Sequence, residues 1–92
     1  MPHSTTPQFE VGQVIATPAV IDHLPYEDVI NLLRLHTCGY WDHLDPEDVA
    51  ANEEAVNVGN RVLSAYFVRG EKVWVITESD RSYTTLLFPY EY

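Results

Sequence analysis

The sequence has one cysteine, few basic residues and no long apolar run. The lone Cys38 excludes an internal disulfide and a cysteine-based zinc site, and a single free thiol suits a reducing cytoplasm. No run of about 18 apolar residues is present, so a membrane-spanning helix is not expected. Residues 1–8 are polar and lack the basic and apolar regions of a signal peptide. These absences together predict a cytoplasmic protein.

Basic residues number five against fourteen acids, which gives a formal net charge of −9. A field of this sign repels phosphates, so direct contact with nucleic acid is not expected. The expected partner is a basic protein surface, such as that of a nucleic-acid-binding protein. Residues 35–60 contain no Lys or Arg but six acids, namely Asp42, Asp45, Glu47, Asp48, Glu53 and Glu54. Two interpretations stay open, a solvated helix face that aids solubility or an acidic binding face.

Start and stop signals predict helices in the first two thirds of the chain. Thr17, followed by proline, is typical of a helix N-cap. Pro25 ends that short helix, and a second one is expected from there to Gly39. Asp45, again followed by proline, predicts a third helix that runs to about residue 58. An apolar stripe at helical spacing predicts that the second helix is well buried; it consists of Tyr26, Val29, Ile30, Leu33 and Thr37.

The last third of the chain changes to a strand pattern. Segments 61–68, 72–77 and 82–88 are rich in β-formers and separated by short turns, which predicts an antiparallel three-strand meander. Segment 12–17 predicts a further strand at its edge. The expected fold is therefore α+β, with an antiparallel sheet of about four strands and two or three helices packed on one face. Residues 1–10 are expected to be a flexible lead-in and residues 11–92 a single domain.

No catalytic, metal-binding or cofactor motif is present. His36 and Cys38 are two residues apart on a helix and so point to different faces, which argues against a Cys–His nucleophile pair. Asp80 and Arg81 lie in a turn, where Asp80 is expected to bond to local backbone. We therefore expect no enzyme, no metal and no cofactor. A structural role or a ligand site at His36, Asp80 and Arg81 stays open.

Aromatic residues next to the acidic stretch are candidate anchors for a partner. Tyr40 and Trp41 lie in the connection between the second and third helices, and Tyr and Trp are favoured at binding hot spots. For Trp41, packing over the helix junction and exposure as an anchor are both open. Trp74 lies within a predicted strand, where packing is the expected role.

Three stretches resemble a family of short "plasmid-related" proteins from bacterial plasmids and other mobile elements. They are GQVIATPAVIDHL (12–24), HTCGYWDHLDPEDVAANEEAV (36–56) and the segment 61–92, which ends in ITESDRSYTTLLFPYEY. The family pattern has an HxxGDWG-like segment and an ITExDRSxTTxLLPxEY-like ending; here Tyr40 and Asp42 stand in place of its Asp and second Gly. The resemblance implies a mobile-element origin. It implies an origin more than a mechanism; inhibition of host defence, as an anti-restriction or anti-CRISPR protein, is expected only by analogy with other small acidic proteins of mobile elements.

Three hypotheses about function follow. The favoured one is a protein-binding module that uses the acidic stretch and its neighbouring aromatics. The second is a structural or regulatory accessory protein that forms a homodimer through a sheet edge or the tyrosine-rich tail. The third is a small enzyme or ligand binder, which requires that His36, Trp41 and Arg81 converge on a pocket.

Overall fold

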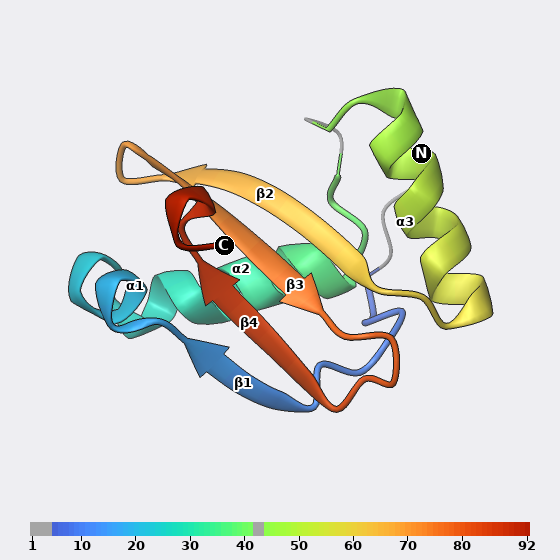
Figure 1. Ribbon diagram of the computed structural model, residues 1–92, viewed down its shortest axis with the longest axis horizontal. Helices are drawn as coiled ribbons and strands as arrows, with labels where there is room; N and C mark the ends of the chain where they lie inside the picture. The colour runs from blue at the N-terminus through green and yellow to red at the C-terminus, as the bar shows by residue number, and fades with distance from the viewer. Residues whose placement is uncertain (1–4, 42–43) are drawn as a thin grey trace.

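The computed structural model describes residues 5–41 and 44–92 and places them in one sheet with three helices (Figure 1). In chain order, the elements are β1 (Gln13–Ala16), α1 (Pro18–His23), α2 (Tyr26–Thr37), α3 (Pro46–Val58), β2 (Val62–Val68), β3 (Glu71–Thr77), β4 (Tyr83–Leu87) and the 3-10 turn η1 (Pro89–Glu91). The predicted α+β class is confirmed. Among the described residues, no helix has the length and apolar character needed to cross a membrane.

The sheet has the strand order β1-β4-β3-β2. Strands β2, β3 and β4 form the predicted antiparallel meander, with Ile76 opposite both Leu63 and Thr85. The expectation of a wholly antiparallel sheet is wrong at β1, which runs parallel to β4 with Ile15 opposite Thr85. Side chains alternate with a period of two in either direction, so the sequence pattern does not distinguish the two pairings.

Helices α1 and α2 cover one face of the sheet, whereas α3 lies beside its β2 edge (Figure 1). The main core fills the space under α1 and α2 with residues from both layers, including Val20, Leu24, Leu32, Val73, Val75 and Leu86. On α3, Asn52 donates from Nδ2 to the Leu63 carbonyl at 2.8 Å and accepts from the Leu63 N–H at 3.3 Å. The Asn52 amide thus satisfies backbone groups of the edge strand β2, as a neighbouring strand would.

The apolar stripe of α2 is less buried than its spacing predicts. Tyr26 is 76% exposed and Ile30 is 47% exposed. The side of α2 that faces the sheet is centred instead on Leu32 and His36, both of which are buried. Additional leucines make the apolar pattern of this helix broad, and a broad pattern does not define the centre of the buried face.

The N-terminal segment is tied to the end of α2 over its described part. The Gln8 N–H donates to the Thr37 carbonyl at 2.9 Å, and Gln8 Nε2 donates to the Cys38 carbonyl at 3.3 Å. The Phe9 ring packs edge-on against His36 with 5.1 Å between centroids. Residues 8 and 9 of the predicted lead-in are therefore part of the packed structure.

A close approach of two backbones brings β1 beside β4. Gly12 has a positive φ of 63°, and a Cβ atom at this position would lie 2.3 Å from the Ser82 carbonyl oxygen. Only glycine fits such a contact without moving the backbone. After β1, the predicted cap is present, because Thr17 Oγ1 accepts a hydrogen bond from the Val20 N–H at 3.3 Å.

Candidate functional site

His36 and Arg81 both lie against the Phe9 ring, and Trp41 belongs to a small core on which this ring packs. His36 contacts this ring edge-on, and the Arg81 guanidinium lies 5.3 Å from the ring centroid. Trp41 belongs to a small core with Ala55, against which Phe9 also packs. The arrangement is therefore a packed region of the core, in which Phe9 lies between His36 and Arg81.

A buried chain of hydrogen bonds runs from α2 across the sheet to the segment before β1. His36 Nδ1 lies 2.5 Å from Ser64 Oγ, and His36 Nε2 lies 2.8 Å from Thr77 Oγ1. Thr77 Oγ1 lies 2.6 Å from Thr84 Oγ1, which donates to the Val11 carbonyl at 2.8 Å. Each strand of the meander contributes one hydroxyl to this chain, and α2 contributes the imidazole.

The donor and acceptor of each hydrogen bond in this series follow from the single proton that each hydroxyl can donate. Because Thr84 donates to Val11, Thr77 must donate to Thr84, and His36 Nε2 must then donate to Thr77. The neutral imidazole accepts at Nδ1, so Ser64 is the donor there. His36 is thereby held as the Nε2–H tautomer.

Burial keeps His36 uncharged. The pKa of His36 is lowered to about 3, chiefly because burial penalises the imidazolium and also because Arg81 carries a positive charge nearby. A serine hydroxyl on a neutral histidine is the arrangement of an activated nucleophile. Here, however, Ser64 and His36 are both 0% exposed, so no substrate reaches the pair. Its role is to fix α2 to the sheet.

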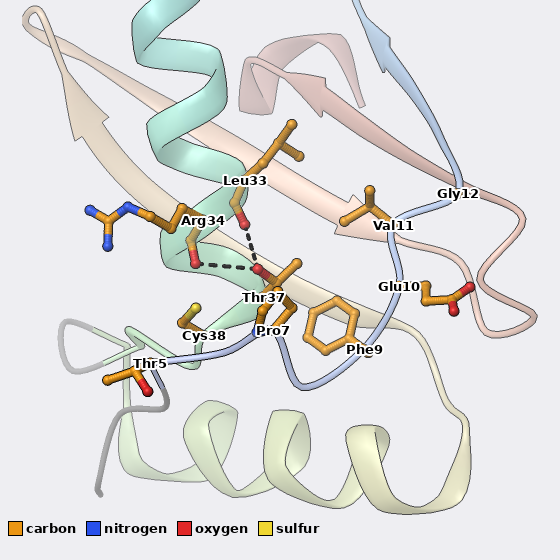
Figure 2. Close-up of a pocket in the computed structure, with 10 residues that line it drawn as sticks. All are labelled: Thr5, Pro7, Phe9, Glu10, Val11, Gly12, Leu33, Arg34, Thr37 and Cys38. Atoms are coloured by element: carbon orange, nitrogen blue, oxygen red, sulfur yellow. Dashed lines mark hydrogen bonds between the residues drawn. The ribbon is translucent and has the colours of Figure 1, made fainter.

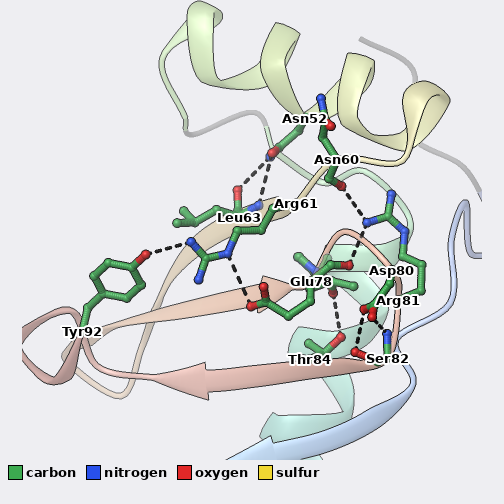
Figure 3. A network of polar contacts seen from close by, with 12 residues as sticks. Asn52, Asn60, Arg61, Leu63, Glu78, Asp80, Arg81, Ser82, Thr84 and Tyr92 are labelled. Atoms are coloured by element: carbon green, nitrogen blue, oxygen red, sulfur yellow. Dashed lines mark hydrogen bonds and ion pairs between the residues drawn. The ribbon is translucent and has the colours of Figure 1, made fainter.

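The turn between β3 and β4 contains the other two candidate site residues (Figure 3). Asp80 accepts hydrogen bonds from the Ser82 N–H at 3.0 Å and the Ser82 hydroxyl at 2.6 Å, and these bonds lower the pKa of Asp80. Arg81 donates to the carbonyls of Asn60 at 2.6 Å and Ala55 at 3.0 Å. Arg81 therefore caps the C-terminal end of α3, where carbonyls lack helical partners, and both residues have structural contacts.

Trp41 is buried and Tyr40 is partly buried. Trp41 is 1% exposed, so it cannot act as an exposed anchor in this conformation. The Tyr40 carbonyl accepts a hydrogen bond from the Tyr66 hydroxyl at 3.1 Å, and burial raises the pKa of Tyr66 to about 12. Asp42, the third candidate in this connection, lies outside the described residues.

The remaining acidic candidates are on α3 and at its start, and they do not share one face. Glu47 and Glu54 are seven residues apart and lie on the side of the helix away from the core. Asp48 and Glu53 are five residues apart and diverge by about 140° around the helix axis. Asp45 is exposed at the N-cap and makes no side-chain cap bond. The acids therefore surround the outer part of α3 without forming one face.

A hollow lies between the N-terminal segment and the C-terminal half of α2 (Figure 2). It has a volume of ≈670 Å³ and a mostly apolar lining that includes Phe9, Val11 and Leu33. The Thr37 hydroxyl faces the Leu33 and Arg34 carbonyls, to which it can donate at 2.9 and 3.3 Å. Nucleophilic chemistry has no support here, because Cys38 is buried. The hollow is suited mainly to an apolar group, although Glu10 and Arg34 are also part of its lining.

Among the described residues, no α-helix lies across the sheet face opposite α1 and α2, but η1 contacts β3 there and Tyr92 packs edge-on against Trp74 (Figure 1). Strand alternation directs every second side chain to this face. We call this surface the open face, and it comprises Gln13, Ile15, Leu63, Ala65, Phe67, Lys72, Trp74, Ile76, Tyr83, Thr85 and Leu87, with Arg61, Glu78 and Tyr92 beside them. Apart from its polar and charged positions, the face is apolar and aromatic. Ala65, Ile76 and Leu87 are buried within it, whereas Phe67 and Tyr92 are exposed, and exposed rings on such a face are unusual for a solvated sheet surface.

Cations lie next to the exposed rings of the open face. Lys72 Nζ lies 5.4 Å from the centroid of Phe67, which is 76% exposed. The Arg61 guanidinium lies 5.6 Å from the Tyr92 centroid, donates to the Tyr92 hydroxyl at 2.8 Å and pairs with Glu78 at 3.4 Å (Figure 3). Two of the five basic residues thus gather on this face.

Sequence reasoning did not select the open face as a candidate site. Its signal was present in the strands, where Leu63, Phe67, Trp74 and Leu87 occupy the positions between the inward-facing residues. In a sheet with one solvated face these positions are normally polar. Apolar residues at both sets of positions indicate a second covered face or a binding surface.

No protein-family description, no curated protein and no solved structure matches this chain. The resemblance to the plasmid-related family stays a prediction. Across residues 5–41 and 44–92, no three His, Cys, Asp or Glu side chains gather as a metal site.

Proposed function

We propose that the chain is a protein-binding module whose contact surface is the open face, with the acids of α3 at its rim. The observation that carries the proposal is the exposed aromatic pair Phe67 and Tyr92, each with a cation beside it, on an apolar sheet face. Large rings with low conformational freedom are the usual anchors of protein interfaces. Exposed aromatic side chains on an apolar sheet face are a sign of an interaction site.

The complementary partner has an apolar centre and a basic rim. Helix α3 lies next to the open face at β2, where Asp48 and Ala51 line a hollow together with Arg61 and Leu63. Protein interfaces commonly have such an apolar core with a charged border. The acidic border increases the rate of encounter with a basic surface. The rings of Phe67 and Tyr92, which become buried in the complex, determine how long the complex lasts.

Affinity capture with matched baits tests this assignment. The baits are the natural chain, Phe67→Ser, and a control, Tyr26→Ser, whose ring is equally exposed at 76% but lies on the α2 side of the sheet. We expect Phe67→Ser to lose the captured protein and Tyr26→Ser to retain it. Loss of a central anchor costs about 2 kcal/mol, or roughly thirtyfold in affinity.

A charge variant separates the two parts of the interface. Replacing Glu47 and Glu54 by Gln should slow association and weaken its salt dependence while leaving dissociation nearly unchanged. A partner that binds Phe67→Ser as tightly as the natural chain would contradict the open-face proposal. A partner lost only from the charge variant would favour the acidic surface as the main site.

The resemblance to plasmid-related proteins extends this proposal to the inhibition of host defence. In that case the partner is a nucleic-acid-binding defence protein, whose basic surface the acidic rim would match. Expression of the chain in a restricting or CRISPR-protected bacterial host should raise the plating efficiency of a targeted phage. Phe67→Ser should abolish this effect, and equal plating with and without the chain would contradict the inhibitor role.

A further inference from the structure

The two edges of the sheet differ in how their backbone groups are satisfied. At the β2 edge, Asn52 of α3 pairs with both backbone groups of Leu63. At the other edge, Gln13 and Thr17 direct their N–H groups to β4, where they donate to the Ser82 and Leu86 carbonyls at 3.0 and 3.1 Å. By alternation, Val14 and Ala16 direct their N–H and C=O groups away from the sheet.

No described element lies beyond β1 (Figure 1). All three of its first residues are exposed, and Ile15 is 41% exposed on the open face. On the opposite face, Val14 borders an apolar hollow of ≈590 Å³ that Ile21 and Tyr26 also line. The edge therefore presents free donors and acceptors with apolar side chains on both sides, which is the surface that an added strand recognises.

The charge pattern identifies the occupant as a second copy of this chain. Residues 11–21 contain no charged residue, although the whole chain carries a net charge of −9. Two copies of such an acidic protein repel one another except where both surfaces are neutral. A basic partner would gain nothing electrostatically from this edge, and natural edges are usually protected by charge.

We propose that β1 is a dimerisation strand, through which two copies pair antiparallel about a two-fold axis at Ile15. In this register Val14 lies opposite Ala16 of the second copy, and Ala16 lies opposite its Val14. Both pairs exchange two hydrogen bonds from the outward groups. Ile15 faces its own symmetry mate in a non-hydrogen-bonded pair, at a Cα separation of about 4.5 Å. The two four-stranded sheets become one continuous sheet, with the helices of both copies on the same side.

Disulfide trapping tests the register directly. In Ile15→Cys, the two introduced thiols would be close enough to bond, because bridged Cα atoms are about 4.4–6.8 Å apart. In the control Gln13→Cys, which is on the same face of β1, the symmetry mates would be about 13 Å apart along the strands. Mild oxidation should therefore link Ile15→Cys into dimers and leave Gln13→Cys monomeric. The native Cys38 is buried. Oxidation of the natural chain measures any crosslinking through Cys38, which is the background for both variants.

Sedimentation of variants with a charged residue at position 15, on the two-fold axis, provides a second test. The natural chain should dimerise as its concentration rises from about 1 µM to about 1 mM, the range of weak interfaces. Ile15→Glu and Ile15→Lys should each weaken self-association at least about tenfold, because like charges then face each other. A mixture of the two variants should recover the dimer.

Three results would overturn the proposal. The first is a natural chain that stays monomeric throughout this concentration range. The second is equal crosslinking of the Ile15 and Gln13 cysteine variants. The third is an Ile15→Lys variant that dimerises more strongly alone than the natural chain, since that outcome would reflect net charge and not a two-fold contact. None of these results depends on the partner of the open face.

Discussion

The buried His36 makes the stability of the protein depend on pH in a range where most carboxylates do not titrate. Its pKa is about 3 in the folded chain and about 6.5 in an unfolded one. Between these values the unfolded state binds one proton more than the folded state, so stability rises with pH. The contribution is fully present above pH 6.5 and is lost as the pH falls toward 3.

The expected size of the effect follows from the two pKa values. Each pH unit between them changes the free energy of unfolding by about 1.4 kcal/mol. Lowering the pH from 7 to 5 should therefore cost about 2 kcal/mol through His36 alone. Urea unfolding at pH 7, 6 and 5 measures this slope.

A variant and a spectroscopic measurement assign the slope to His36. His36→Gln removes the titrating group, so the difference between pH 7 and pH 5 should fall by about 2 kcal/mol. If that variant does not fold, the ¹⁵N shifts of the His36 imidazole in the natural chain provide the test. They should report the neutral Nε2–H tautomer at pH 5, since the single Thr77 proton goes to Thr84 and Thr77 can only accept from the imidazole. Titration of His36 near pH 6.5, or an Nδ1–H tautomer, would refute the proposed donor order.

Two further predictions concern the sheet edges. Gly12→Ala should destabilise the fold by more than about 2 kcal/mol, because the new Cβ meets backbone; Gly70→Ala also has a positive φ but open space around it, so it should cost only about 1 kcal/mol. Asn52→Ala should cost about 1–3 kcal/mol through the unpaired Leu63 groups, whereas the exposed Asn57→Ala should be nearly neutral. Thermal or urea unfolding of the four variants measures both contrasts.

Local signals in the sequence were sufficient to locate the elements. Thr17 and Pro25 mark helix boundaries through capping and proline geometry, which act within a few residues. The β2–β4 meander follows from short turns between strand patterns. The direction of β1 could not be predicted in the same way, because it depends on contacts between residues about 70 positions apart.

The candidate site residues were harder to interpret for a related reason. His36 was visible as a polar residue on a helix, but its partners Ser64 and Thr77 lie on two separate strands. Their positions alternate with buried apolar residues, so a polar cluster on the inner face could have been predicted. The hydroxyls that contact the imidazole depend on the angle at which α2 crosses the sheet. A local sequence pattern does not predict this crossing angle.

If both proposals hold, the dimer presents two open faces side by side on one continuous sheet, with Ile15 at the shared axis. Two linked faces bind an immobilised or repeated partner with avidity, because the second contact is intramolecular. Ile15→Glu should then lower the apparent affinity for a densely immobilised partner about a hundredfold or more. The same variant should bind a monomeric partner in solution with nearly unchanged affinity, as long as the partner contacts Phe67 and Tyr92 and not β1. An equal loss of affinity for the immobilised and the monomeric partner would show that Ile15 contacts the partner directly. Binding at the open face would then not depend on dimerisation.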